Sequence, residues 1–144
     1  MRLTVALATG AGVAAVAVTA VPAQTRTSQW DGVYTEAQSK RGEALYGKYC
    51  VSCHGEDLTG GGAESAPTLV GRRFTTQWDG RTLGDLFERT FVTMPQDAPG
   101  SLSREQHVDI LAFVLTRNSF PAGTTELTSQ PEALSAIRIV AERP

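Results

Sequence analysis

Two cysteines and a histidine in the run Cys50-Val51-Ser52-Cys53-His54 constrain this chain more than any other feature. The cysteines are three residues apart and His54 follows directly, so on one turn of helix all three side chains point the same way. Haem has two vinyl groups, each able to form a thioether with one cysteine, and neutral imidazole is a common ligand of haem iron. The run therefore predicts one covalent haem c, bound through Cys50 and Cys53, with His54 on the iron.

Other uses of a Cys-x-x-Cys pair fit this chain less well. A thioredoxin-like redox pair is expected within a βαβ unit, and the sequence shows no such pattern. A structural zinc site usually takes four ligands, and only His107 could join the three side chains of the motif, at a spacing that fits no common zinc pattern. A disulfide between residues so close in sequence would add little stability by loop closure.

The first 23 residues are typical of a secretory signal peptide. Arg2 is the only early charge, an apolar run rich in Ala and Val extends to Val21, and Ala23 completes a small-residue cleavage site. Residues 1–23 would then be removed and the mature protein would be periplasmic. The alternative is an uncleaved membrane anchor, because the apolar run approaches the ~20 residues that span a bilayer. Its shortage of leucine favours cleavage over stable insertion.

Size and charge narrow the possible partners. Cleavage would leave 121 residues, enough for one small domain. The mature chain would carry 12 basic and 15 acidic side chains, a net charge of −3, with Lys40 and Lys48 as its only lysines. This balance argues against nucleic acid as a partner and against docking through a ring of lysines.

Helical periodicity and capping patterns predict an all-α fold. Three main helices are expected, at residues 35–50, 82–94 and 103–117. The first and third begin at sequences typical of capping boxes, Thr35–Gln38 and Ser103–Gln106, and Pro95 ends the second. The third helix is almost continuously apolar in its second half, so it should be well buried.

These elements give an expected organisation for the whole chain. The signal peptide (1–23) and a polar lead-in (24–34) precede a haem-binding domain over residues 35–120, which a C-terminal tail (121–144) follows. The tail contains a candidate short helix at 132–137, after a proline at a helix-start position.

Met94 is the best candidate for the sixth iron ligand. It is the only methionine left once Met1 departs, and Pro95 holds it in an extended conformation outside the helix. A thioether opposite an imidazole suits an electron carrier, because this ligand pair raises the reduction potential. His107, the only other histidine, is expected on a solvated helix face. Ligation by two histidines and an open sixth position remain alternatives.

With these residues in place, the chain resembles the mono-haem class I cytochromes c. The resemblance covers about residues 35–120. It implies a small fold of three main helices wrapped around one covalent haem, in which Gly42 and Tyr46 of the first helix cross the third helix near residues 110–113. It also implies that Met94 is the distal iron ligand.

The same resemblance assigns a role to Pro67. Its carbonyl would accept a hydrogen bond from the ring N–H of His54, with Leu69 as an apolar contact behind it. Such a bond fixes the imidazole tautomer and raises its basicity. Four further residues could donate to the haem propionates, although nothing in the sequence selects among them: Arg72, Arg73, Trp78 and Arg81.

More narrowly, the chain is similar to small exported bacterial cytochromes found alone or fused to quinoprotein dehydrogenases, over residues 30–34 and 120–123. This implies periplasmic transfer of single electrons with transient redox protein partners: a dehydrogenase, an oxidase or another cytochrome. We expect an electron carrier and not an enzyme, touching the membrane only if the signal is retained. The alternatives are a haem c subunit of an oxidoreductase complex and a haem enzyme with an open sixth position.

Overall fold

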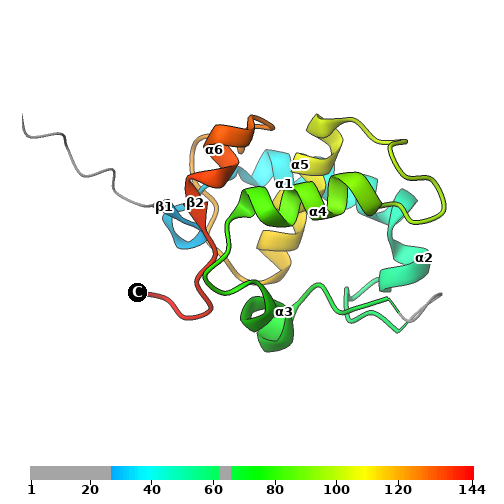
Figure 1. Ribbon diagram of the computed structural model, residues 1–144, viewed down its shortest axis with the longest axis horizontal. Coiled ribbons are helices and arrows are strands. Elements are labelled where there is room, and N and C mark those ends of the chain that lie inside the picture. Colours follow the sequence, from blue (N-terminus) through cyan, green and yellow to red (C-terminus); the bar gives the residue numbers. More distant parts are fainter. Residues whose placement is uncertain (1–26, 62–65) are drawn as a thin grey trace, which may run out of the picture.

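Helices dominate the computed structural model, which describes residues 27–61 and 66–144 (Figure 1). The predicted signal peptide lies outside the described residues. The helices are α1 (Glu36–Tyr49), α2 (Val51–His54), α3 (Gly71–Trp78), α4 (Leu83–Thr93), α5 (Arg104–Arg117) and α6 (Pro131–Ser135). A 3-10 turn, η1 (Gln29–Asp31), and two short strands, β1 (Thr27–Ser28) and β2 (Ile137–Arg138), complete the described elements. The predicted all-α class is confirmed, and α1, α4 and α5 are the three expected helices.

Reciprocal hydrogen bonds between side chain and backbone fix where α4 and α5 begin. The Thr82 hydroxyl accepts from the Asp85 N–H at 3.1 Å, and the Asp85 carboxylate accepts from the Thr82 N–H at 2.8 Å. Ser103 and Gln106 form the same pair of bonds at the start of α5. These capping boxes satisfy backbone donors that have no partner inside the helix.

The start of α1 departs from its prediction in one respect. Thr35 caps the helix by accepting from the Gln38 N–H at 3.1 Å, as expected. The Gln38 amide does not turn back to the helix start, however. It donates to the Leu127 carbonyl and accepts from the Leu127 N–H, both at 2.8 Å. The expected capping box is therefore half formed, because the C-terminal segment competes for the Gln38 side chain.

The core forms where α1 crosses α5. A Cβ placed on Gly42 would overlap the backbone carbonyl oxygen of Asp109, so the two helices touch through their main chains at this point. One turn later the rings of Tyr46 and Phe113 pack with centroids 5.3 Å apart. The close approach expected at Gly42 is thus present, and it explains why a glycine occurs inside a helix despite its propensity penalty of ~1 kcal/mol.

The segments on either side of residues 35–120 pack on the same core. Leu127, Leu134 and Ile139 are each at most 5% exposed and belong to the main hydrophobic cluster. Strand β2 pairs in parallel with β1, and Figure 1 shows this pair at the end of the molecule opposite α2. The tail therefore fastens the N-terminal segment to the domain.

Helix α3 was not predicted from the sequence. Its residues are mostly polar, Phe74 is its only buried side chain, and no side chain caps its start at Val70. No capping pattern was available to indicate it, and its apolar face consists of Phe74 and Trp78 alone. Within the two described ranges, no helix has the length and apolar character needed to cross a membrane.

Candidate haem site

A cavity of about 360 Å³ brings together every site residue predicted from the sequence. We call it the main cavity, and its lining includes Cys50, Cys53, His54, Pro67 and Met94. Much of the remaining wall is apolar or aromatic: Tyr46, Phe74, Trp78, Leu86, Leu102, Leu111 and Val114. Its volume and mostly apolar wall with a few polar groups are typical of pockets that bind organic cofactors.

The cysteine–histidine motif follows α1 with almost no break. Cys50 is both the C-cap of α1 and the N-cap of α2, and its carbonyl accepts from the N–H groups of Cys53 and His54 at 3.2 and 2.9 Å. This single turn directs both thiols and the imidazole to the main cavity. Burial, reinforced by the neighbouring Cys53, raises the pKa of the Cys50 thiol to about 11. Cys50 is therefore a neutral thiol at neutral pH.

His54 is 7% exposed and is oriented by one hydrogen bond. Its Nδ1 lies 3.0 Å from the carbonyl oxygen of Pro67. A carbonyl can only accept, so Nδ1 carries the proton and donates it to Pro67. Nε2 is then the nitrogen with a lone pair available for a metal ion. This is the geometry that the resemblance implied for these two residues.

Met94 reaches the main cavity from α4, at the point where that helix ends. It is the C-cap residue, with its N–H donating to the Thr90 carbonyl at 2.8 Å. Its backbone is extended, with φ −121° and ψ 148°, as expected for a residue that precedes proline. The thioether and the imidazole thus approach one cavity from different helices, α4 and α2.

The expectation that His107 lies on a solvated face is wrong. Its side chain is 4% exposed and also lines the main cavity. The rings of Phe87 and Phe91, stacked at 5.6 Å, meet the His107 imidazole edge-on at 6.3 and 5.3 Å. The contact of α4 with α5 covers this face of α5. Burial and, secondarily, the charge of Arg104 lower the His107 pKa. Its Nε2 has no hydrogen-bond partner among the described residues.

Several residues that line the main cavity were not among the site residues predicted from the sequence. Trp78 lines the main cavity together with Gln77, Tyr49 and Arg89. The Arg81 guanidinium lies over the Trp78 ring at 5.6 Å. Trp78 and Gln77 belong to α3, so they could not be placed without that helix. The available signal was the pair Phe74 and Trp78, one helical turn apart in a mostly polar stretch.

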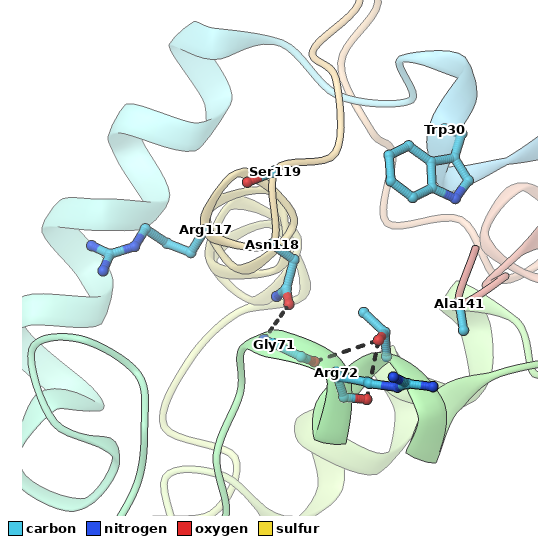
Figure 2. Close-up of a pocket in the computed structure, with 8 residues that line it drawn as sticks. Trp30, Gly71, Arg72, Arg117, Asn118, Ser119 and Ala141 are labelled. Atoms are coloured by element: carbon cyan, nitrogen blue, oxygen red, sulfur yellow. Dashed lines mark hydrogen bonds between the residues drawn. The ribbon is translucent and has the colours of Figure 1, made fainter. Parts of the chain in front are cut away.

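Arg72 lies in a second, smaller depression of about 260 Å³, formed where α3 meets the end of α5. Figure 2 shows the side chains of Arg72 and Arg117 directed away from each other, while Asn118 points to Gly71. The two guanidinium groups do not converge on a common point. Arg72 is therefore not placed with the residues of the main cavity.

Comparisons with known proteins found a matching family model and a similar solved structure. The family model described as cytochrome c oxidase, cbb3-type, subunit III matches residues 37–114. The fold is similar to that of the sulfane dehydrogenase SoxCD from Paracoccus pantotrophus, with a TM-score of 0.51 and 23% identity, over 86% of this chain and 67% of that chain. At this identity the similarity concerns the fold alone. No curated protein sequence matches the chain.

Proposed function

Because the chain belongs to the family of cytochrome c oxidase, cbb3-type, subunit III, we propose that it is an exported carrier of single electrons with a covalently bound, His/Met-ligated haem. Membership makes it a mono-haem c-type cytochrome, and haem-based electron transfer is the general activity. The proposal adds the attachment residues, the iron ligands, the periplasmic location and the role as a mobile carrier.

In this proposal, each chemically distinctive side chain of the main cavity has one role. Cys50 and Cys53 would hold the haem through thioether bonds, one to each of its two vinyl groups. His54 would bind the iron through Nε2, and Met94 would bind it through its sulfur. When bound, the haem supplies the one-electron Fe(III)/Fe(II) couple.

The observation that carries the proposal is the convergence of these side chains on one apolar cavity. The main cavity is lined by two thiols, an imidazole oriented by a hydrogen bond, and a thioether, although Met94 is 40 residues from His54 in sequence. The Pro67 carbonyl already fixes the tautomer that leaves Nε2 for iron. A zinc site is not supported, since no cluster of three or more His, Cys, Asp or Glu side chains suited to a metal ion occurs in residues 27–61 and 66–144.

The surroundings of the ligands suit a carrier. The His54 ring is held by its bond to the Pro67 carbonyl, and the Met94 backbone is held at the end of α4 by its N–H bond to the Thr90 carbonyl. Both ligands can therefore stay in place in the two oxidation states. Small reorganisation of this kind favours fast electron transfer. A carrier would meet its redox partners through a small, transient interface near the cysteine motif.

Two measurements on protein purified from its native host test the proposal. Mass spectrometry after acid denaturation should give the polypeptide plus one haem, with residues 1–23 absent. Carbon monoxide added to the reduced protein at neutral pH should leave the spectrum unchanged, because His54 and Met94 would both be bound to the iron. Haem that is extracted by acid and organic solvent would contradict covalent attachment. Immediate carbon monoxide binding would instead support a haem enzyme with an open sixth position.

The family description favours one alternative. The matching family model is named for a subunit of an oxidase, so this cytochrome could serve as the haem c subunit of an oxidoreductase complex. The two roles differ in particle size. Gel filtration of a native extract should place the carrier at the mass of a single chain, whereas a permanent subunit would elute with larger partners.

A further inference from the structure

The side chain of Asn118, at the end of α5, makes all its hydrogen bonds with backbone groups. Its Nδ2 donates to the carbonyls of Val114 and Leu69 at 2.8 and 2.9 Å. Its Oδ1 accepts from the N–H of Gly71 at 3.0 Å, the bond drawn between these residues in Figure 2. One half-buried amide thus joins the last turn of α5 to the segment 69–71.

That segment directly continues from the residue that orients His54. Leu69 is two residues after Pro67, and it is held from both sides: its N–H donates to the Leu58 carbonyl at 2.8 Å, and its carbonyl accepts from Asn118. The Pro67 carbonyl, which accepts from His54 at 3.0 Å, therefore lies on a strip of backbone whose far end is fixed by Asn118.

We propose that Asn118 is a positioning residue that holds the Pro67 carbonyl against His54 and so helps to set the reduction potential. The inference rests on the proposed function, in which His54 binds iron. A carbonyl that accepts from the Nδ1–H makes the imidazole a stronger electron donor, which stabilises Fe(III) over Fe(II). Loosening the strip weakens this bond and raises the potential.

Two other amides in the chain form similar clamps elsewhere. Gln38 binds both backbone groups of Leu127, and Gln29 binds both backbone groups of Val140. Both clamps fasten the C-terminal segment, and neither touches residues 67–71. Gln38 is therefore a matched control, because it is a buried amide with two hydrogen bonds to the backbone. Loss of these bonds should lower the stability of the protein without changing the reduction potential.

The test compares Asn118→Ala with Gln38→Ala in the haem-loaded protein. The measurements are the midpoint potential, the melting temperature and the exchange of the His54 ring N–H by NMR. Asn118→Ala should raise the potential and speed the exchange of this proton by up to about tenfold, the limit that complete loss of the single His54–Pro67 hydrogen bond would set. Gln38→Ala should lower the melting temperature and leave both haem readouts at the wild-type values.

The outcomes distinguish failure of the role proposed for Asn118 from failure of the proposed function. If both variants lower the melting temperature and neither moves the potential or the exchange, Asn118 is merely structural and the inference is overturned. If Asn118→Ala does not fold, Asn118→Ser, which keeps one hydrogen-bond donor, takes its place. It should raise the midpoint potential and speed the His54 N–H exchange, by less than is expected for alanine. If both stay at the wild-type values, the inference is overturned. A wild-type spectrum without a ligated His54 ring would refute the proposed function before any variant is compared.

Discussion

Replacing Gly42 by alanine should destabilise the protein, although alanine is the better helix former. The gain in helix propensity is ~1 kcal/mol. Overpacking typically costs about 1–3 kcal/mol, and the upper half of that range applies here because the new Cβ meets the rigid backbone carbonyl of Asp109 instead of a flexible side chain. The expected net loss is ~1–2 kcal/mol, which lowers the melting temperature by about 4–8 °C for a domain of this size.

Gly47 in the same helix provides the control. It is exposed, and a Cβ placed on it would meet no atom within 4 Å. Gly47→Ala should therefore raise stability by about 0.5–1 kcal/mol, through propensity alone. Thermal unfolding of the two haem-loaded variants, followed by far-UV circular dichroism, should show shifts of opposite sign. If both alanines raise the melting temperature, α1 and α5 do not touch at Gly42 and the packing argument is wrong.

Three further predictions concern the main cavity. Met94→Ala should open the iron to carbon monoxide and Met94→His should lower the midpoint potential, whereas His107→Ala should do neither; the reverse result would support ligation by two histidines. Burial lowers the His107 pKa below its ordinary value of ~6.5. As the pH falls through ~6.5, the unfolded chain therefore binds more protons than the folded protein, and the free energy of unfolding decreases. The melting temperature of His107→Phe should lack this fall, and parallel pH profiles of variant and wild type would contradict it. In Cys50→Ala/Cys53→Ala with the haem extracted, an empty cavity of about 360 Å³ would cost up to ~9 kcal/mol at ~24 cal/mol per Å³. This cost is comparable to the total free energy of unfolding of a small domain, so the haem-free variant should show no sharp melting transition. A sharp transition by calorimetry would refute the estimated cost.

The features that could be predicted from the sequence have short-range signals. The haem motif lies within five residues, and the start of α5 lies within the four residues of a capping box. Met94 was singled out by its uniqueness and by the proline that follows it, and the structure indeed shows an extended backbone at the end of α4. Each of these depends on neighbours in the chain, whose geometry local rules describe well.

His107 shows why local patterns fail elsewhere. Polar residues surround it in sequence, which indicated a solvated face. Its burial depends on Phe87 and Phe91, which lie 16 or more residues away and reach it only because α4 packs on α5. The residues adjacent to His107 carry no such information. The available signal was its spacing from Ile110, Leu111 and Val114, which lie on the same face of the helix and line the same cavity.

The amide clamps extend this argument from burial to hydrogen bonding. Gln29 and Gln38 are 0% and 2% exposed, yet as polar residues they gave no sign of being buried. Each satisfies one N–H and one carbonyl of a C-terminal residue, 111 and 89 positions away, in a segment with little regular secondary structure of its own. Buried backbone groups without such partners would be costly, so the clamps replace the ladder bonds that the tail lacks. Local sequence therefore specifies the groups proposed to bind haem, whereas the attachment of the C-terminal segment depends on polar side chains whose partners become apparent only in the folded chain.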